Sequence, residues 1–165
     1  MNISPQALIA VVRLNITRRP LMSAEAAQDL LDINRRQLDA LVENGAVAWA
    51  WNFAVNPGRK AAKKEIRLLA ASVVERAAGP ILSIGATRNL GFPEVLSLVL
   101  PAQRETLRGA ELQRWFSVSA DWCRDMRRIG AIKCVAEKLP AKGVNASPHF
   151  TRESVVEFIK SRRMT

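Results

Sequence analysis

INRRQLDALVENGAV, residues 33–47, is the stretch of sequence that decides the fold. Asn34 is a residue type preferred at a helix N-cap, and Gln37 follows three positions later, which is the spacing of a capping box. Apolar residues then recur at helical spacing until Gly45, a residue type typical of helix C-termini. The stretch predicts a short helix over residues 35–43 with a well-defined start.

A second helix is predicted just before this stretch. Ser23 is a suitable N-cap, Glu25 lies in the first turn, where the helix dipole favours negative charge, and apolar residues continue at helical spacing to Leu31. The short segment Asp32-Ile33-Asn34 then separates the two helices. Two helices joined by such a turn form a helix-turn-helix.

A β-hairpin is predicted after the second helix of this motif. Residues 47–55 alternate aromatic and smaller residues through Trp49 and Trp51, which is the period of a half-buried strand. A turn at residues 56–58 leads to a return strand near residues 66–68. We expect one tryptophan in the core beneath the hairpin and the other at a junction between units.

The same features recur about 85 positions later in the chain. Residues 118–132, VSADWCRDMRRIGAI, match residues 33–47 at an offset of 85 and are apolar where their partners are apolar. Ser154-Val155-Val156-Glu157 matches Ser72-Val73-Val74-Glu75 at an offset of 82, and two further blocks match in the same order. Because identities are few, chance is the alternative, but the shared order favours an internal duplication.

The duplication predicts two units with the same order of elements. Unit one covers residues 1–80, unit two covers residues 91–165, and an apolar linker over residues 81–90 is expected to pack. Unit one also has a predicted first helix over residues 5–14 and a closing helix over residues 70–78. In unit two, helices are predicted over residues 109–116, 119–129 and 151–162, and strands over residues 131–136 and near Phe150.

The composition is that of a small basic globular protein. The chain has 165 residues and a formal net charge of +10, and both its halves carry an excess of Lys and Arg. With two Cys, one His and no Tyr, the sequence indicates neither a metal site, a nucleophilic triad nor a tyrosine nucleophile. No apolar run reaches the roughly 20 residues that span a membrane. We therefore expect a cytoplasmic protein that is not an enzyme and has no metal or cofactor.

The positive charge gathers at positions suited to duplex DNA. Arginine can pair with guanine, and asparagine or glutamine with adenine, so the start of the predicted helix over residues 35–43 holds base-reading chemistry. A basic run on the hairpin is suited to phosphate contacts, whereas the alternative is a solvated helix start and a solvated loop. The predicted DNA-binding residues are Asn34, Arg35, Arg36, Gln37, Arg59, Lys60, Lys63 and Lys64 in unit one, and Ser119, Arg124, Arg127, Arg128, Lys138 and Lys142 in unit two.

Unit two has the weaker recognition helix of the two. Asp121 would repel phosphate, and Trp122 recurs with Met126 and Ile129 at helical spacing, which favours a core position over a wedge between bases. We expect unit two to read less sequence information or to contact chiefly the DNA backbone.

Residues 21–75 and 107–160 resemble the winged-helix domains of the MerR and phage-excisionase superfamily. These domains combine a Ser- or Thr-capped helix, a turn, a short Arg-rich recognition helix, a Gly followed by a strand and a wing, and a closing helix that begins like Ser-Leu-Leu-Glu. Residues 72–75 and 154–157 stand in that last place. Excisionases usually carry one such unit, whereas this chain carries two in tandem.

The expected fold is therefore mainly α with short β-hairpin wings, arranged as two tandem winged helix-turn-helix units. The expected function is sequence-specific binding of double-stranded DNA. The resemblance implies a transcriptional regulator or a recombination accessory factor of a phage, plasmid or other mobile element, associated with the nucleoid. Its further partners would be a second copy of the chain, a recombinase or an RNA polymerase component. The alternative is a helical adaptor that binds an acidic partner protein.

Overall fold

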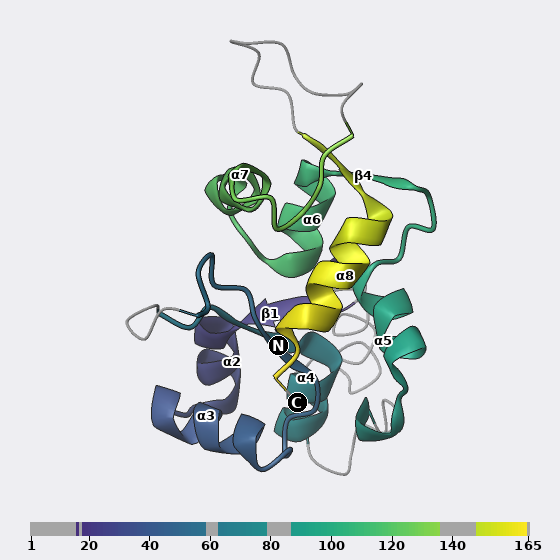
Figure 1. The fold of residues 1–165 in the computed structure, drawn as a ribbon. Coiled ribbons are helices and arrows are strands. Elements are labelled where there is room, and N and C mark those ends of the chain that lie inside the picture. Colours follow the sequence, from purple (N-terminus) through teal and green to yellow (C-terminus); the bar gives the residue numbers. More distant parts are fainter. Residues whose placement is uncertain (1–15, 17, 59–62, 79–86, 136–147, 165) are drawn as a thin grey trace, which may run out of the picture.

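The computed structural model describes residues 16, 18–58, 63–78, 87–135 and 148–164 (Figure 1). Within these parts of the chain there are seven α-helices and five short strands, which form two small antiparallel sheets. The prediction of a mainly helical chain with short hairpins is confirmed at this level. The first predicted helix, over residues 5–14, lies outside the described residues.

In the first segment, residues 20–78, three helices accompany a three-stranded sheet. The sheet has the order β1-β3-β2, and Leu68 of the central strand lies opposite Met22 on one side and Ala50 on the other. The elements are β1 (Leu21–Ser23), α2 (Ala24–Leu31), α3 (Arg35–Glu43), β2 (Ala50–Asn52), β3 (Ile66–Leu69) and α4 (Ala70–Ala78).

The second segment, residues 105–164, repeats this order with a smaller sheet. Strands β4 and β5 pair with Leu107 opposite Phe150, and an isolated bridge adds Cys134 beside Phe150. The elements are β4 (Thr106–Arg108), α6 (Gly109–Phe116), α7 (Ala120–Arg128), β5 (His149–Thr151) and α8 (Arg152–Arg162). Between the segments lie the 3-10 helix η2 (Thr87–Asn89) and α5 (Phe92–Val99).

Individual hydrogen bonds recur between the segments, with the donor N–H displaced by 85 positions and the acceptor hydroxyl by 82. The Ser72 hydroxyl accepts a hydrogen bond from the Ala48 N–H at 2.8 Å, and the Ser154 hydroxyl accepts one from the Lys133 N–H at 3.0 Å. The helix-ending residues with positive φ are also spaced by 85, namely Asp32 and Gly45 in the first segment and Ser117 and Gly130 in the second. The two segments therefore share local geometry as well as element order.

The predicted helices agree with the structure more closely than the predicted strands. The observed bounds of α3, α4 and α6 coincide with the predicted ones, whereas the strand predicted over residues 47–55 shortens to β2. Trp49 has a φ of 67°, which breaks the extended backbone before β2. After β2, the Asn52 side-chain oxygen accepts hydrogen bonds from the N–H groups of Ala54 and Glu65 and so closes the hairpin.

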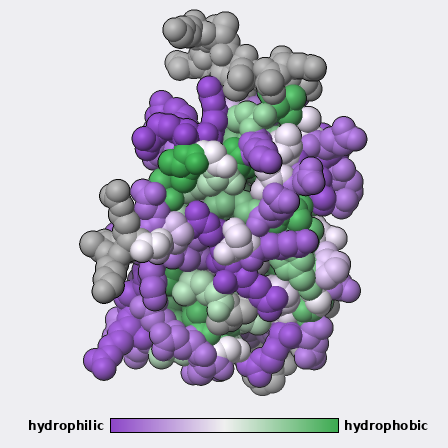
Figure 2. All heavy atoms as spheres, viewed as in Figure 1, coloured by the Kyte–Doolittle hydropathy of each residue, from purple (hydrophilic) through white to green (hydrophobic). Residues whose placement is uncertain are grey.

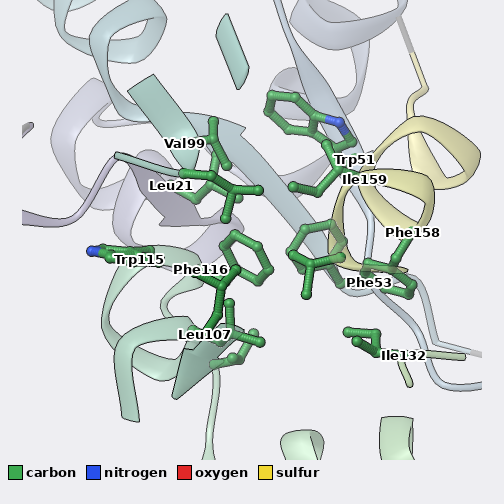
Figure 3. Packing of buried hydrophobic residues seen from close by; sticks show 14 of the residues in the cluster. Leu21, Trp51, Phe53, Val99, Leu107, Trp115, Phe116, Ile132, Phe158 and Ile159 are labelled. Atoms are coloured by element: carbon green, nitrogen blue, oxygen red, sulfur yellow. The ribbon is translucent and has the colours of Figure 1, made fainter. Parts of the chain in front are cut away.

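Two hydrophobic clusters stabilise the chain. The smaller one lies inside the first segment, between its helices and the sheet face that carries Ile66 and Leu68. The larger one contains residues of both segments, including Leu21, Phe53 and Phe116, and Figure 3 shows these side chains pointing toward one another. The opposite face of the first sheet is thus buried by the second segment.

Both hairpin tryptophans belong to this larger cluster. Trp51 is completely buried, Trp49 is 5% exposed, and their ring centroids lie 6.3 Å apart. The prediction that they take two different places is wrong, because the two indoles stack on one another within one cluster, although Trp49 precedes β2 and has a positive φ. This cluster joins the two segments.

Each segment contributes a different surface to the contact between them. The second segment contributes the α6–α7 turn and the end of α8, and the first contributes its sheet. The Arg67 guanidinium donates to the Phe116 carbonyl at 2.9 Å, and the Ser117 hydroxyl donates to the Leu21 carbonyl at 2.7 Å. Helix α8 reaches across to the first segment, where the Met164 N–H donates to the Ala50 carbonyl (Figure 1). The contact is heterologous, so no twofold axis relates the two segments.

Candidate nucleic-acid interface

Helix α3 begins with a complete capping box. The Asn34 side-chain oxygen accepts from the Gln37 N–H at 3.0 Å, and the Gln37 side-chain oxygen accepts from the Asn34 N–H at 2.9 Å. A bidentate contact to adenine needs the oxygen and the nitrogen of one amide. Because both oxygens already bond to the backbone, base reading by these two residues would compete with the cap.

The two arginines at the start of α3 have different surroundings. Arg35 Nε lies 3.0 Å from Asp39 Oδ1, one helical turn away on the same helix. Arg36 is exposed, and it forms no salt bridge within the described part of the chain. A free guanidinium has the fork geometry that matches the major-groove edge of guanine. Arg36 is therefore the α3 side chain with the greatest freedom to contact a ligand.

The end of the hairpin adds positive charge beside the start of α2. Lys63 and Lys64 are exposed and line a shallow hollow together with Glu25 and Arg67. The backbone hydrogen bond at the start of α2 lowers the pKa of Glu25, with further contributions from Ser23, Arg67 and Arg35. Glu25 thus links the hairpin electrostatically to the start of α3. Two predicted hairpin residues, Arg59 and Lys60, lie outside the described residues.

Helix α7 carries its cations in a different arrangement. The Ser119 hydroxyl caps the helix by accepting from the Trp122 N–H at 3.1 Å. Arg124 pairs with Asp121, and Arg128 lies 3.1 Å from Asp125. Arg127 is exposed and has no salt bridge among the described residues. The predicted contacts Lys138 and Lys142 lie in a range that the structure does not describe.

The start of α7 is partly covered by the first segment. Trp122 is 4% exposed and its ring stacks on Phe53 at a centroid distance of 5.6 Å, so the expected core position is confirmed. The residue 85 positions earlier is Gln37, which is exposed. Arg36 likewise corresponds to Asp121. The two helix starts are thus unequal, because that of α3 is open and basic whereas that of α7 is partly buried and acidic.

Several cations outside the predicted set are also notable in the structure. Arg67 lies within a strand, is 6% exposed and holds the two segments together. Its only sequence signal is a cation inside the apolar run IRLL. Exposed Arg18 and Arg19 precede β1, and Arg114 and Lys133 lie on the second segment. Isolated exposed cations of this kind follow no motif. Figure 2 shows that, on the side of the molecule seen in Figure 1, hydrophilic side chains cover most of the surface, with hydrophobic patches between them.

The described residues show little that would support other kinds of site. No cluster of three or more His, Cys, Asp or Glu side chains suited to a metal ion occurs among them. None of the helices in these ranges is long and apolar enough to cross a membrane. Both cysteines are free thiols, and burial raises the pKa of Cys123 to about 12.

Comparisons with protein-family models, with curated proteins and with solved structures found no match.

Proposed function

We propose that the chain binds double-stranded DNA, with α3 in the major groove and the β2–β3 hairpin against the backbone. The observation that carries the proposal is the exposed Arg36 at a helix start held by a capping box, on the same segment as the exposed Lys63 and Lys64 of the hairpin. A recognition helix contacts base edges with its N-terminal residues, while cations around it bind phosphates. A fixed cap positions Arg36 without using its guanidinium.

We further propose that the chain is a tandem pair of winged helix-turn-helix units that arose by duplication. The repeated element order and the repeated hydrogen bonds of Ser72 and Ser154 support this. On this proposal the likeness to the MerR and excisionase superfamily reflects descent. The chain would then act as a transcriptional regulator or as an accessory factor in recombination of a mobile element.

The two units would contribute unequally to recognition. The start of α3 is open, whereas α7 uses Trp122 to hold the first segment and carries Asp121 where α3 carries Arg36. Arg127, which has no salt bridge among the described residues, is suited to a phosphate contact. Unit one would therefore read bases, and unit two would add affinity without sequence information.

The first test is the salt dependence of binding. A preferred duplex is selected from a random pool, and its affinity is measured by fluorescence anisotropy between about 50 and 200 mM salt. About six to ten phosphate contacts predict a loss of roughly 10³ to 10⁵ in affinity over this range. A flat dependence would contradict DNA binding, and tight binding to an acidic protein in its place would favour the adaptor.

The second test separates base reading from backbone contact. Arg36→Ala should weaken binding to the preferred duplex and reduce discrimination at one base pair by about 1–3 kcal/mol. Lys63→Ala with Lys64→Ala should weaken all duplexes alike and lower the salt slope by about two. The matched control is Lys160→Ala, which removes a cation of α8 that lies 5.7 Å from the ring centroid of Phe92 on α5. Equal discrimination by Arg36→Ala and the wild type would exclude Arg36 as the base-reading residue.

A further inference from the structure

A hollow of about 540 Å³ lies where several parts of the chain meet. Its lining comes from the end of α3, from the backbone before β2, from the stretch between η2 and α5, and from the end of α8. Pockets of about 300 to 1,000 Å³ at the junction of structural units are common binding sites of small organic ligands. We call this one the Trp49 hollow, and its lining includes Asn44, Trp49, Arg88, Leu90, Phe92 and Arg163.

The first segment has one residue more than the second at the edge of this hollow. In the second segment one residue, Lys133, donates its N–H to the hydroxyl of Ser154 and accepts from the N–H of the last residue of β5. In the first segment the same two bonds are divided between Ala48, which donates to Ser72, and Trp49, which accepts from the last residue of β3. Trp49 is thus an additional residue, and insertions of this kind redirect side chains.

The additional residue has a backbone conformation that a tryptophan seldom adopts. The φ of Trp49 is 67°, and a bulky residue at positive φ is strained. Two contacts hold its side chain, because the indole Nε1 donates to the Thr87 carbonyl at 3.0 Å and the Arg163 Cζ lies 4.1 Å from its ring centroid. Strained residues that their surroundings fix in this way gather at binding and active sites. The strain at Trp49 therefore points to a ligand of the hollow.

The polar side chains of the Trp49 hollow are hydrogen-bond donors. Arg88 and Arg163 are exposed, and the bond from Arg88 Nη2 to the Gly45 carbonyl, 2.9 Å long, uses one of five guanidinium N–H groups. The Asn44 side-chain oxygen accepts a backbone N–H at 2.9 Å, which leaves the amide NH₂ to donate. The described lining contains no Asp or Glu, although Glu94 lies beside its edge on α5. The hollow therefore suits an anion.

The remaining lining is apolar and aromatic. Phe92 is half-buried, its ring centroid lies 6.4 Å from that of Trp49, and Lys160 Nζ lies 5.7 Å from it. Since Trp49 is only 5% exposed, Phe92 is the ring of this pair that a ligand can reach. Aromatic rings bind nucleobases by stacking, and the arginine fork matches phosphate oxygens. Both kinds of group border the same hollow.

We propose that the Trp49 hollow binds a free nucleotide. Arg88 and Arg163 hold its phosphate, and its base lies against Phe92. A free nucleotide suits this place better than duplex DNA, because a duplex keeps its bases stacked inside and offers only its backbone and groove edges to a concave surface. The site is separate from the exposed start of α3, so the inference goes beyond the proposed function and does not depend on it.

Binding is measured by isothermal titration calorimetry of the full chain with the four ribonucleoside monophosphates, each titrated alone. At the ligand efficiency usual for molecules of this size, the preferred nucleotide should bind with a Kd on the order of 10 μM. Its nucleoside and inorganic phosphate each carry only one of the two recognised groups and should bind at least tenfold more weakly. No binding of any of the four at about 1 mM, or a nucleoside that binds as tightly as its nucleotide, would overturn the proposal.

Variants of the lining locate the site. Arg88→Gln and Arg163→Gln should each weaken nucleotide binding at least tenfold, and Phe92→Leu, which stays apolar but cannot stack, should weaken it about fivefold or more. The matched control is Arg76→Gln, which removes an exposed guanidinium of α4 that does not line this hollow. Circular dichroism verifies that each variant is folded. Equal effects of Arg88→Gln and Arg76→Gln would contradict the assigned phosphate contact.

A second readout needs no variant of the arginines. In ¹⁵N–¹H spectra of the wild type, the preferred nucleotide should shift the indole N–H signal of Trp49. The indole signal of Trp115 should stay in place, because Trp115 is similarly buried, lies on α6 and does not line the hollow. A nucleotide that binds without moving the Trp49 signal occupies another site, and this result would also overturn the proposal.

Duplex binding is measured separately on the same variants. If Arg88→Gln combined with Arg163→Gln weakens duplex binding while no nucleotide binds the wild type, the two arginines contact the DNA backbone and the nucleotide site is refuted. A chain that binds the nucleotide but no duplex would contradict the proposed function and leave this site intact.

Discussion

The indole Nε1 of Trp122 donates a hydrogen bond to the Phe53 carbonyl oxygen at 2.8 Å, although the two residues are 69 positions apart in the chain. The bond joins the first turn of α7 to the hairpin of the first segment. Trp122 also contacts Phe116 and Phe158, at ring-centroid distances of 6.4 Å and 5.6 Å. A helix start that corresponds to the open start of α3 thus serves here to hold the segments together.

Trp122→Phe should therefore destabilise the protein despite keeping an aromatic ring. The substitution leaves the buried Phe53 carbonyl without its donor, which costs about 1–3 kcal/mol. The free energy of unfolding is measured by urea denaturation followed by circular dichroism. Trp115→Phe is the matched control, since Trp115 is similarly buried and its indole forms no hydrogen bond among the described residues. Equal losses in the two variants would show that the hydrogen bond is not the source.

Arg67→Met should destabilise the junction by about 2–4 kcal/mol. The Arg67 guanidinium bonds to the Phe116 carbonyl, the Ile66 carbonyl and the Glu65 carboxylate, and methionine satisfies none of them. Urea denaturation measures the change. Arg114→Met, at an exposed position of α6, should change stability by less than about 0.5 kcal/mol. If Arg67→Met were equally neutral, the guanidinium would contribute nothing net to the junction.

The helices could be predicted because their signals are local. Asn34, Ser119 and Thr151 act as side-chain caps within three residues of their partners, so a short stretch of sequence contains the whole interaction. Strands β1 and β4 were not predicted. Each has three residues, too few for a period of two to be recognised, and each forms only by pairing with a strand more than 40 positions away.

The candidate site was predicted in its chemistry and less well in its geometry. The start of α3 was predicted. Asn34 and Gln37 suit both a capping box and base reading, and only the structure shows that their side-chain oxygens bond to the backbone. The burial of Trp122 and the role of Arg67 depend on how the segments pack. Packing between distant segments leaves no periodic signal in the sequence.

Raising the pH should weaken the fold through Cys123. Burial, with a smaller contribution from Cys134, raises the pKa of Cys123 from 9.0 to about 12. An unfolded thiol ionises near pH 9, so the stabilising contribution is complete below that pH and is lost as the pH rises toward 12. Urea denaturation of the wild type at pH 7 to about 10.5 is compared with that of Cys123→Ala. The wild type should lose stability more steeply above pH 9, and parallel curves would contradict the burial of this thiol.

Gly45→Ala and Gly130→Ala should destabilise the protein by similar amounts, although neither position is crowded. Both glycines have positive φ, 69° and 72°, and a Cβ added to either would meet no atom within 4 Å. The cost is therefore that of the left-handed backbone alone, about 1–2 kcal/mol for alanine and less for asparagine. Thermal unfolding measures it, with Gly58→Ala as control, because Gly58 is equally open but has no positive φ. Equal costs at Gly45 and Gly130 would mean that both helix ends impose the same backbone. A neutral Gly45→Ala would show that α3 can end in another way.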